Sequence, residues 1–246
     1  MDDLTDRQTD ILKALIKEYT DNGEAIGSEV LEKKYKLGVS PATIRNEMVE
    51  LANKGYLKKE YFSAGRVPSA KGFRFYIKHL MKEKQLSTGD EVAYKNGIWD
   101  ERKDVQRLIA HATKVLAQRT GLIALAVTDS GDLYYAGVGN LLSSHEFLNL
   151  ELSQILLSKL DELNYWGNIE QKLSAMEGSI IFMLGEDDFN DPRFEACGSI
   201  FGEFEGDKIR GMIGVVGPKR MYYDTLTPQI KYFSNLIKEI MQEQKI

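Results

Sequence analysis

The sequence has little cysteine and histidine, and this scarcity excludes several kinds of site. Its 246 residues include a single cysteine, Cys197, so the chain holds neither a disulfide framework nor a zinc cluster of several thiolates. We expect Cys197 to be a small buried residue. The three histidines lack the short spacing of metal-ligand motifs. We therefore predict no metal site and no cofactor.

Long apolar runs and a secretory signal are also missing. No apolar stretch approaches the ~18 residues of a membrane-spanning helix, and the opening MDDLTDRQTD is too acidic and polar for a signal peptide. With 43% hydrophobic and 28% charged residues, the composition is typical of a soluble globular protein. We expect a cytoplasmic protein with no membrane partner.

Catalytic signatures are lacking as well. The sequence has no Walker-type phosphate loop, and Gly137 with Gly139 does not complete a dinucleotide fingerprint. The acidic run EDDFND at residues 186–191 lacks the glycine and glutamate spacing of a calcium loop, which favours a solvated loop. We expect that the protein is not an enzyme, and an enzyme with a helical appendage is the least favoured alternative.

The charged residues are distributed unevenly along the chain. The formal net charge is −5, yet residues 33–82 contain 12 basic residues and three acidic ones. A local positive excess on an acidic protein is typical of a surface that faces nucleic-acid phosphates. A solvated charged face is the alternative interpretation.

Apolar residues at helical spacing predict three helices before residue 55. The first, over about residues 5–20, starts with Thr5 and Gln8 in a capping-box pattern. The second follows the cap candidate Ser28, and the third starts at Ser40 and stops at Gly55. Two short helices joined by a glycine-containing turn predict a helix-turn-helix, whose second helix enters the major groove of DNA.

The third predicted helix has an apolar face and a polar face. Ile44, Met48 and Leu51 recur at the spacing of an inward face. In the major groove an arginine can hydrogen-bond to guanine and an asparagine to adenine, and the methyl groups of alanine and threonine can contact the methyl group of thymine. An ordinary exposed helix surface is the alternative. We predict DNA contacts from the start and outward side of this helix, at Ser40, Ala42, Thr43, Arg45 and Asn46.

The segment after Gly55 has the pattern of a β-hairpin. Residues 56–61 are predicted as a strand, 62–66 as a turn and 67–69 as a short return strand, and a helix is predicted over residues 70–84. Such a wing would reach a phosphate or the minor groove. The wing residues that we expect to contact DNA are Lys58, Lys59, Ser63 and Arg66.

Three motifs in this part of the chain occur together in a known family. They are S-x-x-T-I-R-N-E-M at residues 40–48, S-A-G-R at 63–66 and G-[YF]-R-x-Y-[IV] at 72–77. Residues 39–81 therefore resemble the winged-helix domain of the HrcA family of heat-inducible transcription repressors. A second stretch, GMIGVVGPKRMYY at residues 211–223, is similar to that family's G-x-I-G-V-I-G-P-T-R-M-x-Y segment.

The remaining sequence predicts a second domain of α+β type. Residues 83–99 have little periodicity, so we predict a linker there, between a winged-helix domain at 1–82 and a second domain at 100–246. Helices and strands in the order helix, strand, strand, helix, three strands, helix predict an antiparallel sheet covered by helices. The helices are expected at 100–118, 144–163 and 225–243, and the strands at 122–128, 133–138, 178–184, 196–204 and 209–217. The resemblance implies that this domain is GAF-like.

The resemblance also implies a function. It implies a repressor of chaperone genes that binds an inverted-repeat operator in double-stranded DNA as a homodimer and is kept competent by a GroEL-type chaperonin. The family's inserted dimerisation segment is reduced in this short chain, and any counterpart lies within residues 141–178. Apolar stripes at 105–116, 147–160 and 230–241 are alternative pairing surfaces. A winged-helix regulator whose GAF-like domain senses a small molecule is the alternative function.

Overall fold

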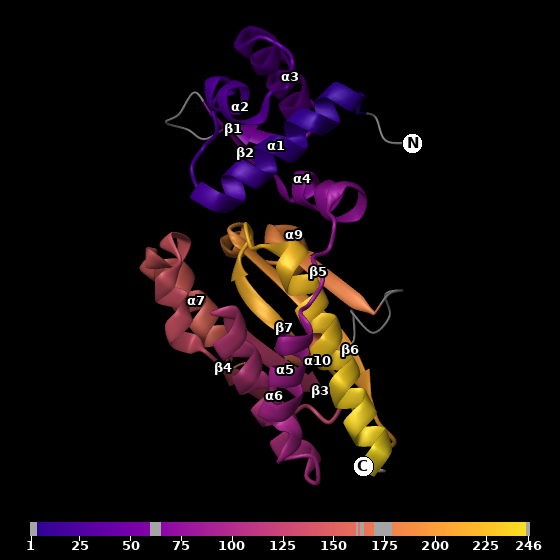
Figure 1. Cartoon of the computed structure of the whole chain (residues 1–246). Helices are drawn as coiled ribbons and strands as arrows, with labels where there is room; N and C mark the ends of the chain where they lie inside the picture. The colour runs from indigo at the N-terminus through magenta and orange to yellow at the C-terminus, as the bar shows by residue number, and fades with distance from the viewer. Residues whose placement is uncertain (1–3, 60–64, 161, 163–164, 170–178, 245–246) are drawn as a thin grey trace. The chain divides into compact units, whose positions relative to one another are not determined.

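The protein is described by a computed structural model that covers residues 4–59, 65–160, 162, 165–169 and 179–244 (Figure 1). The chain divides into two compact units, Met1–Lys82 and Glu83–Ile246. We describe each unit by itself.

The first unit is a winged helix-turn-helix. Its buried residues include Ile11, Leu15, Leu31 and Ile44, all with no exposed surface, so the first three helices share one apolar core. The unit contains α1 (Asp6–Asn22), α2 (Ser28–Tyr35), α3 (Pro41–Asn53), β1 (Leu57–Lys59), β2 (Arg66–Pro68), α4 (Ala70–Phe75) and the π-helical turn η1 (Tyr76–Leu80).

Side-chain caps fix the ends of the helices in this unit. Thr5 and Gln8 form the predicted capping box of α1. Gly55, with φ 81°, ends α3 as predicted, and the next N–H donates back to the carbonyl of Leu51 at 2.8 Å. The predicted cap of α2 was wrong, because Gly27 occupies the cap position and Ser28 is already helical and buried.

The helix predicted over residues 70–84 ends earlier than expected. Its last turn is the π-helical η1, and Met81 is extended, with its N–H donating to the carbonyl of Tyr76 at 2.8 Å. Apolar spacing does not distinguish an α-helix from this wider turn, so the sequence could not reveal the change.

The second unit is built on a five-stranded antiparallel sheet in the order β4-β3-β7-β6-β5. This confirms the predicted antiparallel sheet with covering helices. The strands are β3 (Ile123–Thr128), β4 (Leu133–Ala136), β5 (Ile180–Leu184), β6 (Cys197–Glu205) and β7 (Arg210–Pro218). The other elements are α5 (Thr88–Trp99), α6 (Val105–Thr120), η2 (Val138–Ser143), η3 (His145–Leu148), α7 (Leu150–Leu160), α9 (Gly185–Phe189), η4 (Pro192–Phe194) and α10 (Tyr223–Gln244).

The two faces of this sheet pack against different elements. Because side chains alternate along a strand, Ile123, Leu125 and Val127 of β3 lie on one face, in a core with residues of η3 and α7. Helices α6 and α10 pack against the sheet as well, as Figure 1 shows. Cys197 is fully buried, as predicted, in the core that β3 shares with η3 and α7. Burial raises the pKa of its thiol to about 12.

Most of the linker predicted over residues 83–99 is instead the helix α5. Ser87 caps it by accepting the N–H of Asp90 at 3.1 Å, and Tyr94 and Ile98 are buried one turn apart. The hydroxyl of Tyr232 on α10 donates to the carbonyl of Glu91 at 2.9 Å. These contacts make α5 part of the second unit.

Two other segments differ from the predictions. The helix expected over residues 144–163 is divided into η3 and α7, since Asn149 is extended between them and its side chain accepts the N–H of Glu151 at 3.0 Å. The acidic run expected as a loop begins with the short helix α9, in which Asp188 accepts the N–H of Leu184 at 2.6 Å.

Candidate nucleic-acid interface

The helix α3 presents a polar face to solvent. Ile44 and Leu51 have no exposed surface and Met48 is 4% exposed, whereas Arg45 and Asn46 are exposed. Ala42 is also exposed and Thr43 is partly exposed. The predicted division of α3 into inward and outward sides is confirmed. Arg45 and Asn46 present the two side-chain types that suit guanine and adenine edges.

The N-terminus of α3 lies at the surface. The Ser40 hydroxyl accepts the N–H of Thr43 at 3.2 Å, and the two hydroxyl oxygens are 3.0 Å apart. Pro41 occupies the first helical turn, where its missing N–H leaves no carbonyl unpaired. The positive end of the helix dipole therefore lies beside two hydroxyls, an arrangement that favours a phosphate group.

A buried carboxylate holds α2 against α1. Glu18 is 3% exposed, forms an ion pair with Lys34 and accepts a hydrogen bond from the Tyr35 hydroxyl at 3.1 Å. The hydrogen bond from Lys34 lowers the pKa of Glu18, with burial opposing it and Tyr35 adding to it. Burial, and then the bond to Glu18, raises the pKa of Tyr35 to about 12. This network ties together α1 and α2, the two helices that precede α3.

The wing is a two-stranded antiparallel ribbon. Lys59 pairs with Arg66, and Arg66 also exchanges two backbone hydrogen bonds of 2.9 Å with Ile26. Lys58 and Lys59 are exposed. Arg66, expected in the turn, lies in β2 with a partly buried side chain. Ser63 and the rest of the predicted tip, residues 60–64, lie outside the described residues.

One cavity brings three of the predicted cations together. Its volume is about 520 Å³, and Arg45, Lys59 and Arg66 contribute to its lining. The Nε of Arg66 is buried and has no hydrogen-bond partner among the described residues, which do not include 60–64. Lys58 does not line the cavity, since neighbouring strand residues point to opposite faces. The cavity thus joins the middle of α3 to the wing.

Sequence reasoning missed the part of this cavity that belongs to α2. Ser28, Glu29 and Val30 also line it, and Val30 is 37% exposed. Nothing in the sequence indicated it, since the exposure of Val30 and its neighbours across the cavity both depend on tertiary structure. Glu29 places one carboxylate among the three cations.

Other kinds of site find no support in the described part of the chain. No three histidine, cysteine, aspartate or glutamate residues there are grouped in a way that would hold a metal ion. None of the helices described combines the length and apolar character needed to cross a bilayer.

The chain is similar to curated proteins called heat-inducible transcription repressor HrcA. It is 27% identical over 321 residues to the one from Desulforamulus reducens, covering 89% of this chain and 92% of the relative. That alignment is longer than the 246 residues of this chain, so the relative has residues without a counterpart here. With the one from Clostridioides difficile it is 41% identical over 128 residues, covering 52% of this chain and 38% of the relative.

A solved structure and two family models extend this comparison. A crystal structure of a hypothetical protein at 2.2 Å resolution shares the fold, with a TM-score of 0.80, 19% identity and coverage of 98% of this chain and 99% of that one. Residues 3–60 match the model of the winged helix-turn-helix transcription repressor, HrcA DNA-binding domain. Residues 44–226 match that of the HrcA protein C-terminal domain. The chain therefore belongs to the HrcA family of heat-inducible transcription repressors.

Proposed function

We propose that this protein represses heat-shock chaperone genes by binding an inverted-repeat operator in double-stranded DNA as a homodimer in the cytoplasm. The observation that carries the proposal is the outward face of α3, where Arg45 and Asn46 are exposed on a helix whose opposite face is fully packed. A rigid helix with exposed base-reading side chains is what direct readout in the major groove requires.

The proposed contacts fall into two groups. Arg45 and Asn46 read base edges, with the methyl groups of Ala42 and Thr43 beside them. Backbone contacts position the protein without carrying sequence information. They come from the start of α3 and from the wing, at Ser40, Lys58, Lys59, Ser63 and Arg66.

We propose that the second unit is a GAF-like domain and that the protein dimerises through an apolar patch on it. Of the three apolar stripes considered, those at 105–116 and 230–241 are largely buried inside the unit, which argues against their use in pairing. The third leaves Leu148, Leu150 and Leu157 at 59%, 81% and 37% exposed. An exposed apolar patch of this kind is typical of protein interfaces. This segment also falls within residues 141–178, where the reduced family insertion is expected.

The heat response follows from marginal stability. A change of about 1–2 kcal/mol in the free energy of unfolding alters the folded fraction several-fold, so a modest rise in temperature lowers operator occupancy. A GroEL-type chaperonin would restore the binding-competent fraction by refolding the unfolded chain. Repression would then be lost when heat-damaged proteins occupy the chaperonin.

A gel-shift titration tests the proposal. The probe is the DNA upstream of the chaperonin operon, titrated with random competitor, at several salt concentrations and across the heat-shock range. We expect binding that resists competitor, weakens steeply with salt and declines on heating. Equal affinity for random DNA would contradict it. Operator binding that persists undiminished through the heat-shock range without chaperonin would contradict the thermal mechanism.

A further inference from the structure

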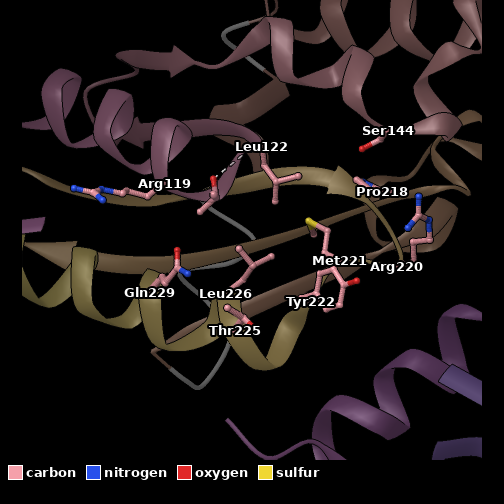
Figure 2. A pocket seen from close by; sticks show the side chains of 11 residues that line it. Arg119, Leu122, Ser144, Pro218, Arg220, Met221, Tyr222, Thr225, Leu226 and Gln229 are labelled. Atoms are coloured by element: carbon pink, nitrogen blue, oxygen red, sulfur yellow. Dashed lines mark hydrogen bonds between the residues drawn. The ribbon is translucent and has the colours of Figure 1, made fainter. Parts of the chain in front are cut away.

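The second unit contains a cavity that the proposed DNA-binding function does not use. Its volume is about 360 Å³, near the lower end of the range for small-molecule pockets. Figure 2 shows it between the end of α6, the end of β7 and the first turns of α10. Apolar side chains form much of its wall: Leu122, Pro218, Met221 and Leu226.

The lining supplies one uncompensated positive charge. Arg220 forms an ion pair with Glu146, including a hydrogen bond of 3.2 Å from its Nη2, so its charge is balanced. Arg119 makes no ion pair within the described part of the chain, and its guanidinium lies 5.6 Å from the ring centre of Tyr94. None of the described residues that line the cavity is an aspartate or a glutamate. These charges favour a monoanion over a cation or a multiply charged phosphate.

A buried acceptor lies at the same end of the cavity. The Oε1 of Gln229 is buried and accepts no hydrogen bond in the described residues. A buried polar atom without a partner destabilises a folded protein, which makes such atoms candidates for ligand contacts. Figure 2 shows Gln229 and Arg119 at one end of the cavity, with Met221 and Tyr222 towards the other.

We propose that this cavity binds a small organic acid whose hydroxyl group lies close to its carboxylate and whose body is apolar. Arg119 binds the carboxylate, because a guanidinium matches it with two parallel hydrogen bonds. The hydroxyl donates to Gln229 Oε1, and the apolar body lies against Leu226 and Met221. A neutral hydroxyl suits this position better than an ammonium group, since no carboxylate lines the cavity to balance a second cation.

The test uses three matched compounds and the full chain. The probe 3-phenyllactate carries all three features, 3-phenylpropanoate lacks the hydroxyl, and 3-phenyllactamide lacks the charge. Isothermal titration calorimetry should give saturable binding of 3-phenyllactate, with each comparison compound at least about tenfold weaker. No saturable binding of 3-phenyllactate below about 10 mM overturns the proposal, as does equal binding of all three compounds.

Two variants test the assigned residues. Arg119→Gln should weaken binding at least about tenfold, whereas Lys114→Gln, which removes an exposed charge from the same helix outside this cavity, should leave it unchanged. Gln229→Leu should abolish the preference for 3-phenyllactate over 3-phenylpropanoate and raise the Tm of the ligand-free protein, because it removes a buried acceptor that lacks a partner. Circular dichroism verifies folding of each variant. Unchanged binding of 3-phenyllactate in both Arg119→Gln and Gln229→Leu overturns the assignment. If either variant fails to fold, the comparison of the three compounds with the unaltered chain remains decisive.

Discussion

Gln8 of α1 donates from its side-chain nitrogen to Glu47 of α3 at 3.0 Å. Its oxygen accepts hydrogen bonds from the Thr5 N–H at 3.3 Å and from the Lys54 ammonium at 3.0 Å. One buried amide therefore joins the cap of α1 to the middle and the end of α3. The bond to Glu47 on the α1 side and the buried Ile44 and Leu51 both favour the orientation of α3 in which Arg45 is exposed.

Replacing this amide should loosen α3. Gln8→Leu removes the buried amide that bonds to both Glu47 and Lys54, so we expect the free energy of unfolding to fall by about 1–3 kcal/mol in urea denaturation. Lys13→Leu is the control, since Lys13 is exposed on the same helix. Equal changes in the free energy of unfolding of the two variants would show that the amide network contributes nothing to stability.

Gly72 should not tolerate a side chain. A Cβ at this position would lie 2.3 Å from the carbonyl oxygen of Tyr56, which is main chain and cannot rotate away. Gly72→Ala should therefore push α4 from the wing and lower the stability by about 1–3 kcal/mol. Gly139→Ala is the control, because Gly139 is exposed and an added Cβ there has no heavy atom within 4 Å. Thermal denaturation that gives Gly72→Ala the same Tm as the wild type would contradict this packing.

The Glu18 network predicts how stability depends on pH. Its carboxyl has a pKa below the ordinary value of 4.5, so the folded state binds the proton less tightly than the unfolded state. The stabilisation is complete above pH 4.5 and is lost as the pH falls through the lowered pKa. The stability difference between wild type and Glu18→Gln should therefore shrink on acidification, in denaturation curves at a series of pH values. A difference that stays constant would rule out the lowered pKa.

The same network predicts an alkaline transition. The pKa of Tyr35 is raised to about 12 by burial and by Glu18, so the folded state favours the neutral phenol. The resulting stabilisation is present below pH 10 and is lost as the pH rises towards 12. Tyr35→Phe should remove this loss of stability between pH 10 and 12. In the wild type, ultraviolet absorbance should show that Tyr35 ionises together with unfolding. A normal phenol titration in the folded wild type would contradict the prediction.

The wing predicts a phosphate contact that carries no sequence information. Lys58 is exposed on β1 and does not line the cavity beside α3. Lys58→Ala should weaken binding to operator and random DNA by the same factor and reduce the slope of log K against log salt by about 1. Lys13→Ala, on the exposed side of α1, is the control. A loss confined to operator DNA would instead assign Lys58 to base reading.

Much of the first unit could be predicted because its signals are local. The cap at Ser40, Pro41 after it and the inward spacing of Ile44, Met48 and Leu51 all lie within one helix. The strand order of the second unit depends on pairing between distant segments, although its antiparallel character followed from the element order. The element α5 was missed because Tyr94 and Ile98 are its only buried residues, and its glycine, asparagine and aspartate residues are typical of a linker.

The two cavities could not be predicted from the sequence. Arg45 and Arg66 are far apart along the chain and share a cavity only because β2 pairs with β1 and with Ile26. Arg119 and Gln229 likewise belong to different helices. Charge counting located the positive region, but it could not separate Lys59, which lines the cavity, from Lys58, which does not.

The central claim is that Arg45 reads a base, and substitution of each operator base pair in turn tests it most directly. For the wild type, replacing a base pair that is read should cost about 1–3 kcal/mol of binding free energy. In Arg45→Ala, we predict that base-pair replacement no longer weakens binding at one position in each half-site, the two positions being related by the symmetry of the operator. Replacement at the other positions should weaken binding as it does for the wild type. An unchanged cost at every position, with only uniform weakening, would assign Arg45 to the DNA backbone and contradict the account.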